Sequence, residues 1–129
     1  MDVRTHAEID PELCGSPLEL GEGFAEVGIA ATERMAVDDR GLVHGGFVFG
    51  LADHAAMLAV NEPTVVLGRA ETRFVRPVVV GDELVAGAEI IERSGNKRVV
   101  YVEVRRGDEV MMTGELVCYV LDRHVLDQR

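Results

Sequence analysis

The stretch HGGFVFGLADHAAMLAV, residues 44–60, decides the fold predicted for this chain. From Phe47 to Val60 its only polar side chains are those of Asp53 and His54, and Ala, Leu, Phe and Met dominate with no strict alternation. This pattern predicts an α-helix that is apolar nearly all round and therefore buried. The helix is too short and too interrupted to span a bilayer, so the surface that covers it must be protein.

The C-terminal half of the chain supplies that covering surface. Segments rich in Val, Ile, Tyr or Thr predict four β-strands, at residues 65–75, 82–92, 97–105 and 109–121. Hairpin turns are expected between them at Ser94-Gly95-Asn96 and Gly107-Asp108. One long helix wrapped by a curved antiparallel sheet is the α+β arrangement that uses these parts.

The segments ahead of the helix complete the prediction. A strand is expected over residues 24–32, with one consistently apolar face formed by Ala25, Val27, Ile29 and Ala31. Residues 1–15 are expected to form short helical turns on the outside of the domain. Thr5 and Glu8 have capping-box spacing, and cap, first-turn and stop positions follow at Asp10, Pro11 and Gly15.

Composition and charge limit the class of protein. With 129 residues, 47% of them apolar, the chain is expected to form one domain over residues 1–129. A formal net charge of -10 argues against a nucleic-acid partner, because such binding requires cations that neutralise phosphates. The first ten residues lack the basic start and apolar run of a signal peptide, which predicts a cytoplasmic protein without a membrane partner. Reduced thiols are therefore expected at Cys14 and Cys118.

Asp53 is the sharpest anomaly, since it places a carboxylate in the middle of an otherwise apolar helix. Aspartate is almost never fully buried without a partner. One explanation is structural: Asp53 accepts hydrogen bonds from neighbouring backbone or from His54 and only fixes the packing. The other is chemical, because a carboxylate near an apolar cleft is suited to act as an acid, a base or a nucleophile.

The tripeptide His44-Gly45-Gly46 lies immediately before the predicted helix, among the unpaired N–H donors at its positive end. Such donors can bind an oxyanion, and glycine lets a carbonyl approach closely, although a simple tight turn would also explain the sequence. Gly45 and Asp53 are roughly 12 Å apart along a helix axis and cannot touch the same carbonyl carbon. They can meet only if a second helix runs antiparallel beside the first, as in a two-fold homodimer.

These residues resemble the signature of the hotdog-fold thioesterases, and specifically of the phenylacetic acid degradation protein (PaaI-like) group. Downstream, Phe74-Val75-Arg76-Pro77 and Gly81-Asp82-Glu83-Leu84 are similar to the aromatic-x-x-Pro strand and the Gly-Asp turn of that family. The resemblance covers roughly residues 17–121, and it is greatest to uncharacterised archaeal members of the group.

The resemblance implies hydrolysis of an acyl-coenzyme A to the free acid and CoA, without a cofactor, by a homodimer or a dimer of dimers. It makes Asp53 the nucleophile or general base, and the Gly45 amide the donor to the thioester oxygen across the dimer interface. His44 would orient the loop or the thioester, and Gly46 and Asp38 would belong to the substrate-binding loop. The candidates for the nucleotide phosphates are Arg73, Arg76, Lys97 and Arg98.

Two departures from the family pattern are present. The family commonly has Asn six residues before the His, where this chain has Asp38, so the hydrogen bonding around His44 is expected to differ. Many members also place Ser or Thr on the strand after the helix to assist the attacking water. Residues 65–68 carry no hydroxyl, and Thr64 lies near but is expected to be misplaced. Both differences leave open a slow enzyme, or one with a different natural substrate.

Three other functions fit the residues less well. A non-catalytic hotdog protein that binds acyl-CoA as a sensor or carrier would leave the pairing of Asp53 with Gly45 unexplained. A hydratase or dehydratase needs a His several residues after the acid, whereas His54 is adjacent to Asp53 and is expected at the helix surface or at an interface. A metal site is rejected, because the spacings of the four histidines match no ligand motif.

Overall fold

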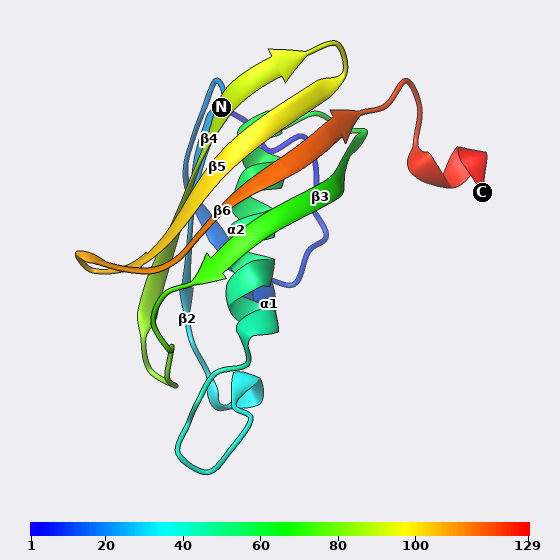
Figure 1. Ribbon diagram of the computed structural model, residues 1–129. Helices are drawn as coiled ribbons and strands as arrows, with labels where there is room; N and C mark the ends of the chain where they lie inside the picture. Colours follow the sequence, from blue (N-terminus) through cyan, green and yellow to red (C-terminus); the bar gives the residue numbers. More distant parts are fainter.

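A long helix lying in the concave face of one antiparallel sheet dominates the computed structural model, which describes residues 1–129 (Figure 1). The helix α2 spans Gly45–Val60. The six strands follow the spatial order β1-β2-β4-β5-β6-β3, so β1 and β3 form the edges. Their bounds are Ser16–Gly21 (β1), Phe24–Ala30 (β2), Val65–Phe74 (β3), Glu83–Ser94 (β4), Lys97–Arg106 (β5) and Glu109–Val120 (β6). The expected α+β hotdog fold is confirmed.

Most predicted elements are confirmed within two residues. The helix begins at Gly45, two residues before the start of the apolar run, and the four C-terminal strands lie where their composition placed them. The two hairpin turns are Gly95-Asn96 and Gly107-Asp108, and both glycines have the positive φ that such turns require. The sequence analysis missed β1, a short edge strand that contains Pro17 and buries none of its residues.

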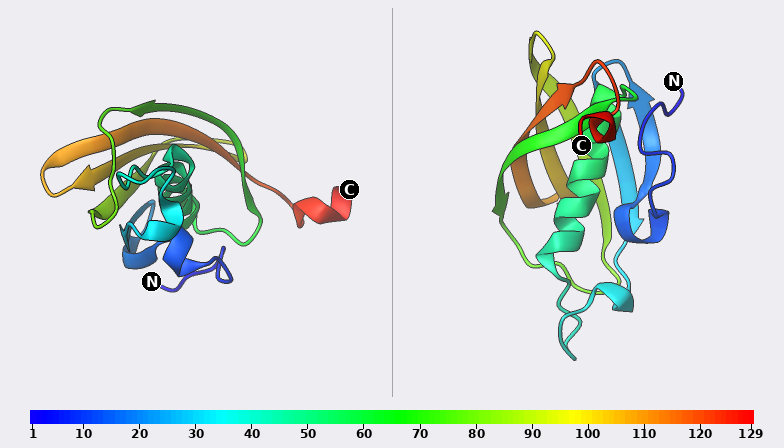
Figure 2. Two further views of the ribbon diagram at one scale, coloured as in Figure 1. Left: turned by 90° about the horizontal axis from the view of Figure 1, so that it is seen from below. Right: turned by 90° about the vertical axis from the view of Figure 1, so that its right-hand side faces the viewer.

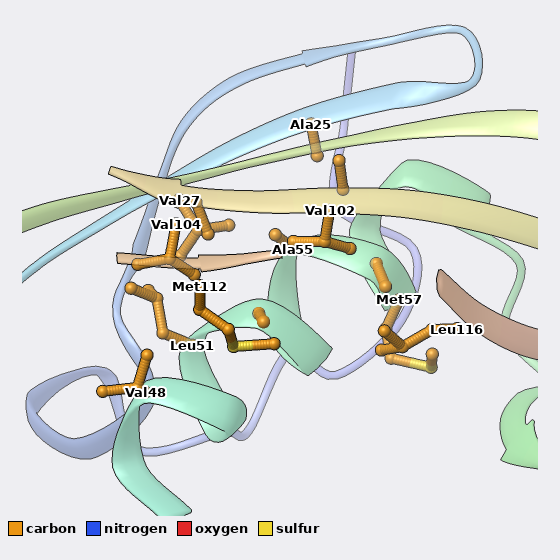
Figure 3. Packing of buried hydrophobic residues seen from close by; sticks show 14 of the residues in the cluster. Ala25, Val27, Val48, Leu51, Ala55, Met57, Val102, Val104, Met112 and Leu116 are labelled. Atoms are coloured by element: carbon orange, nitrogen blue, oxygen red, sulfur yellow. The ribbon is translucent and has the colours of Figure 1, made fainter. Parts of the chain in front are cut away.

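The core lies between α2 and the inner face of the sheet (Figure 3). Leu51 and Met57 of the helix are fully buried there in one cluster with side chains of β2, β5 and β6, among them Val27, Val102, Val104, Met112 and Leu116. Alanines at positions 52, 55, 56 and 59 are also fully buried, and their small size lets the helix lie close to the strands. None of the helices is long and apolar enough to cross a membrane.

The N-terminal segment is less helical than its sequence predicted. Only one turn forms, α1 (Pro11–Cys14), which Asp10 caps through the N–H of Glu12 and which Gly15 ends at a φ of 90°. The predicted capping box of Thr5 and Glu8 is wrong, because Thr5 is buried and its hydroxyl pairs with the neighbouring His6 ring instead. The segment runs along α2 on the side away from the sheet (Figure 2).

Asn61 joins this segment to the end of α2. It adopts the left-handed conformation that ends the helix, and its buried side chain accepts a hydrogen bond from the Arg4 N–H and donates one to the Asp2 carbonyl, both at 2.8 Å. We expect Asn61→Ala to lower the free energy of unfolding by about 1–3 kcal/mol, because both bonds and the favoured left-handed residue are lost. Urea denaturation at one fixed protein concentration measures this.

Arg4→Ala is the matched control for that substitution. It keeps the backbone N–H of residue 4 and removes only an exposed ion pair with Glu62, at 3.6 Å, so its effect should stay below about 1 kcal/mol. Equal effects of the two substitutions would mean that the Asn61 side chain does not hold the segment.

Candidate active site

Backbone hydrogen bonds hold the turn that starts α2. The Val43 N–H donates to the Val78 carbonyl and the His44 N–H to the Met35 carbonyl, both at 2.9 Å. His44 is the residue that precedes the first helical turn, and no side chain caps that turn. The amides of Gly45 and Gly46 therefore keep the unpaired, electropositive character of a helix N-terminus.

Gly45 lines a mostly apolar groove of about 290 Å³. The groove is formed by Val43, Gly45, Val48, Phe74, Val75, Arg76, Pro77 and Val78. A Cβ atom added at Gly45 would lie 3.6 Å from the Phe74 ring, which is ordinary contact, so a side chain would fit there but would occupy the groove. The groove thus combines mostly apolar walls with the backbone of Gly45.

The His44 ring is exposed and lies over Gly46. A Cβ atom at Gly46 would come within 3.0 Å of the ring, and the ring also stands edge-on to Phe47 with centroids 6.0 Å apart. Glycine at position 46 therefore gives His44 the room to fold back over the turn. This places the histidine at the open side of the helix start, although its side chain makes no hydrogen bond to the cap.

Asp53 lies in the middle of α2, and its carboxylate is short of partners. Its Oδ1 atom is shielded from solvent and has no hydrogen-bond partner, which is rare for a buried acceptor. Burial raises the pKa of Asp53 from 3.8 to about 6. The purely structural explanation, in which His54 or backbone donors satisfy this carboxylate, is therefore not supported for Oδ1.

His54 is buried, so its predicted place at the surface or an interface is wrong. Its Nδ1 atom lies 3.0 Å from the Cys14 carbonyl, and only 3% of the residue is exposed. Burial lowers the pKa of His54, which favours the neutral ring with Nδ1–H donating to that carbonyl. His54 therefore holds α1 against α2, and the physical reason for the wrong prediction is that the N-terminal segment covers this face of the helix.

One face of α2 remains incompletely covered. Six residues of the helix are not fully buried, and four of them recur at helical spacing: Gly46, Phe49, Gly50 and Asp53, with Gly45 and Phe47 as the other two. Their spacing of three, one and three places them on one side of the helix. Asp53 lies at the far end of this face and Gly46 at its start, and the intact helix between them keeps Gly45 and Asp53 of one chain roughly 12 Å apart.

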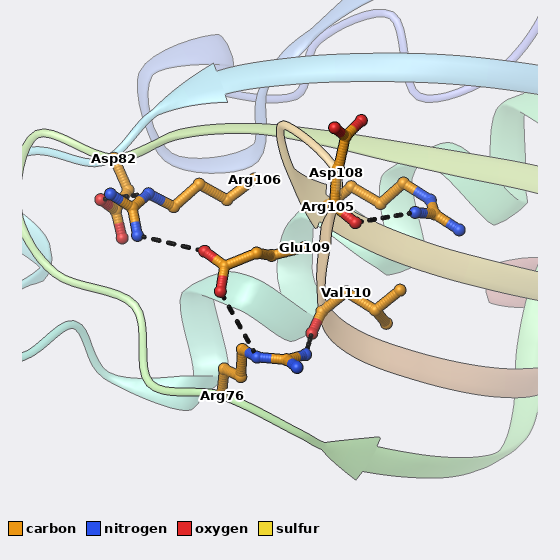
Figure 4. A network of polar contacts seen from close by, with 7 residues as sticks. All are labelled: Arg76, Asp82, Arg105, Arg106, Asp108, Glu109 and Val110. Atoms are coloured by element: carbon orange, nitrogen blue, oxygen red, sulfur yellow. Dashed lines mark hydrogen bonds and ion pairs between the residues drawn. The ribbon is translucent and has the colours of Figure 1, made fainter.

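Arg76 is the only predicted phosphate-binding residue in the Gly45 groove. Its guanidinium donates to the Val110 carbonyl at 2.7 Å and lies 3.5 Å from the Glu109 carboxylate (Figure 4). Glu109 also pairs with Arg106, which reaches the buried Asp82 at 3.2 Å. This network holds Arg76 beside the groove. The sequence analysis did not identify it, although Arg106 and Glu109, which flank the predicted hairpin turn, could have indicated an ion pair there.

The other three cations lie elsewhere. Arg73 lines a polar depression on the outer face of the sheet, and Lys97 lines a neighbouring one. Arg98 donates to the carbonyls of Gly95 and Lys97 and lines a cavity at the C-terminal end of α2. Within one chain the four predicted phosphate contacts therefore form no common patch, because β-strand geometry distributes them over both ends and the outer face of the sheet.

The two departures from the family pattern also have structural consequences. Asp38 accepts hydrogen bonds from the N–H groups of Arg40 and Leu42, at 3.0 and 3.1 Å, and so closes the loop that leads to His44. The Thr64 hydroxyl donates to the Leu121 carbonyl. This bond links the start of β3 to the end of β6, so the hydroxyl does not lie at the Gly45 groove.

The sequence profile of the Thioesterase superfamily matches residues 40–113, so the chain belongs to that superfamily. Among solved structures, it is 57% identical to an uncharacterized protein from Pyrococcus horikoshii, with a TM-score of 0.98 and 98% of each chain covered. It is 26% identical to the E. coli PaaI protein from the phenylacetic acid degradation operon, with a TM-score of 0.74 and 81% of each chain covered. The predicted relationship to hotdog thioesterases and to an archaeal member is confirmed.

Curated relatives have mixed names. The chain is 50% identical over 115 residues to a methylthioribose-1-phosphate isomerase of Aquifex aeolicus, which covers 89% of this chain and 25% of that protein. It is 30% identical over 119 residues to the transcription factor FapR of Thermoanaerobacter sp., which covers 92% of this chain and 60% of that protein. The chain therefore spans between a quarter and about 60% of the length of these relatives.

Proposed function

We propose that this protein is an acyl-CoA thioesterase whose sites are shared between the two subunits of a homodimer. The observation that carries the proposal is the carboxylate of Asp53, which has a buried oxygen without a partner and a pKa raised to about 6. A group in this state is available for proton transfer or attack near neutral pH. Membership of the thioesterase superfamily supports the same chemistry.

A dimer of this kind would cover two surfaces that one chain leaves open. One is the incompletely covered face of α2, and the other is the free edge of β3, ten residues long. An unpaired strand edge is a template for pairing with another strand. A two-fold axis beside this edge would run the two helices antiparallel and bring Asp53 of each subunit toward Gly45 of the other.

In the proposed mechanism, the acyl group lies in the apolar groove and its carbonyl oxygen accepts a hydrogen bond from the Gly45 N–H. Asp53 of the other subunit either attacks the carbonyl carbon or removes a proton from the attacking water. When the tetrahedral intermediate collapses, the C–S bond breaks and the CoA thiolate leaves, taking up a proton to become the free thiol. If water is the nucleophile, the other product is the free acid. If Asp53 is the nucleophile, the acyl group remains on its carboxylate as a mixed anhydride, which a water molecule then hydrolyses to the free acid and the regenerated carboxylate. His44 and Gly46 would position the thioester, and Asp38 would maintain their loop.

The pH dependence of turnover follows from the pKa of Asp53. A base or nucleophile acts in its ionised form, and burial raises the pKa of this carboxyl to about 6. We therefore expect kcat to fall about tenfold per pH unit at pH values well below the pKa and to level off about one unit above it. Initial rates measured across this range check the prediction, and a rate that stays constant through the acid side would assign the reaction to another group.

Release of free thiol from a panel of acyl-CoA thioesters tests the proposed activity. The panel should include short, medium, long and aromatic acyl groups, and sedimentation should show whether the active species is a dimer or a dimer of dimers. Hydrolysis of at least one thioester by the dimer supports the proposal. Binding of acyl-CoA without hydrolysis of any member contradicts it.

One relative is named a transcription factor and not an enzyme, which favours a non-catalytic protein as the second candidate. We take its ligand to be the same acyl-CoA. In that case the Gly45 groove would still hold the acyl group, but Asp53 would not react. The two candidates differ in one measurable way. A binding protein leaves the bound acyl-CoA intact during an incubation much longer than the time needed to reach binding equilibrium, whereas an enzyme hydrolyses it.

A further inference from the structure

The segment that follows β6 extends away from the rest of the molecule. We call residues 121–129 the C-terminal arm; it includes the short 3-10 helix Val125–Gln128 and lies beyond the sheet (Figures 1 and 2). All residues from Asp122 onward are exposed. Two of them are large and apolar: Val125, which is 44% exposed, and Leu126, which is 60% exposed.

The arm makes few contacts with its own chain. Its hydrogen bonds after Leu121 are local, such as the Leu126 N–H to the His124 ring at 3.1 Å and the Asp127 N–H to the His124 carbonyl at 2.9 Å. An open cavity of about 510 Å³ separates it from the turn at Asn96. Isolated helical turns of this length are not stable in water, so packing on a second surface would stabilise the arm.

The base of the arm is fixed beside the free edge of the sheet. The Leu121 N–H donates to the Thr64 carbonyl at 3.4 Å, and the Thr64 hydroxyl donates to the Leu121 carbonyl. Thr64 immediately precedes Val65, the first residue of the edge strand β3. The arm therefore starts next to whatever pairs with the beginning of β3.

In the two-fold dimer proposed above, that neighbour is the end of the partner's β3. Antiparallel pairing of two β3 edges places the beginning of one strand opposite the end of the other. The strand ends at Phe74, and Val75 follows; both line the Gly45 groove, and their exposed fractions are 54% and 50%. An exposed apolar wall of the groove thus lies where the partner's arm begins.

We propose that each C-terminal arm crosses the dimer interface and packs Val125 and Leu126 on Phe74 and Val75 of the other subunit. The arm then covers the outer wall of the groove. Each site would combine the Gly45 groove of one chain with both Asp53 and the arm of the other. This inference rests on the dimer of the proposed function, but it adds a second segment that the partner contributes to the site.

Cross-linking between two co-expressed chains tests the inference. Both chains carry Cys14→Ser, which keeps the backbone carbonyl that His54 binds, and the remaining Cys118 is buried. One chain, with a larger tag, carries Leu126→Cys, and the other carries Val75→Cys. A short bis-maleimide should give a product that joins the two sizes, because the two cysteines can react only across subunits.

Leu18→Cys in place of Val75→Cys is the matched control, since Leu18 is 61% exposed but lies on β1 at the opposite edge of the sheet. It should yield at least about tenfold less mixed-size product.

Shortening the chain to residues 1–122 should also weaken dimerisation by roughly a hundredfold, because the burial of two apolar side chains per arm is lost.

The outcomes separate this inference from the proposed function. A dimer that hydrolyses acyl-CoA but gives equal cross-linking with both cysteines overturns the arm and leaves the thioesterase proposal intact. A shortened chain with unchanged dimerisation also overturns the arm. A chain that sediments as a monomer overturns both the shared site and the arm.

Discussion

Asp53→Asn is expected to reduce kcat by roughly 10³-fold or more while the dimer and acyl-CoA binding are retained. The amide has the shape of the carboxylate but cannot act as a base or as a nucleophile. Turnover of the purified variant on the best thioester of the panel, with binding measured separately, gives the result. Near wild-type turnover would remove Asp53 from the mechanism.

The same substitution should also stabilise the fold at neutral pH. The folded-state pKa of Asp53 lies near 6, above the usual 3.8, so the folded protein binds this proton more tightly than the unfolded chain does. The contribution of Asp53 to stability therefore falls as the pH rises through this range, and above it a charged, partly buried carboxylate opposes folding. Removing the charge removes that cost, and Tm at about pH 7.5 should rise.

Asp39→Asn is the matched control, because this substitution makes the same chemical change at an exposed position in a loop. It should alter neither turnover nor Tm. A loss of activity together with a gain in stability at position 53 alone is the signature of a functional carboxylate. A merely structural Asp53 would lose stability instead.

Two inactive variants are expected to restore activity when their subunits mix. Asp53→Ala lacks the carboxylate, and Gly45→Val fills the groove beside the oxyanion donor. The Gly45→Val variant should fold, because the atoms nearest to a Cβ at this position belong to the Phe74 ring at ordinary contact distance and Gly45 has no positive φ. Each homodimer should be inactive, because both sites lack the carboxylate in the first variant and both have a blocked oxyanion donor in the second.

In a mixed dimer, one site pairs the intact Gly45 of one chain with the intact Asp53 of the other, and the second site carries both lesions. If subunits exchange at random in an equal mixture, half of the dimers are mixed, and activity should recover to about a quarter of wild type per subunit. A pull-down of differently tagged chains confirms the exchange. Confirmed mixed dimers that stay inactive would mean that Gly45 and Asp53 do not act across the interface.

The central helix and its carboxylate were predictable because both depend on local patterns. A long apolar run without alternation predicts a buried helix, and one acid inside it stands out whatever surrounds it. The strands were predictable for the same reason, since period-two alternation and glycine-containing turns are properties of short segments. The family motif at His44-Gly45-Gly46 pointed to the superfamily to which the chain belongs.

The surroundings of these elements were not predictable from such patterns. His54 was expected at a surface, but the N-terminal segment, forty residues earlier at Cys14, covers it and accepts its hydrogen bond. The edge strand β1 was not predicted, because this six-residue strand contains a proline and has no buried apolar face that would give a recognisable pattern. The sequence analysis assigned four cations together to the nucleotide phosphates. In the structure, the direction and pleat of the strands separate Arg76 from Lys97 and Arg98.

The sequence by itself determined the positions of the central helix and of most strands, and it singled out Asp53 and Gly45 as candidate site residues, because periodicity and single anomalous residues are local signals. Only the tertiary structure decided that Oδ1 of Asp53 is left without a partner, that Arg76 is the one predicted phosphate-binding cation that borders the groove, and that β3 and the C-terminal arm lie open on one side. These properties depend on which distant segments come together around each group, and contacts of that kind are made in space rather than along the chain.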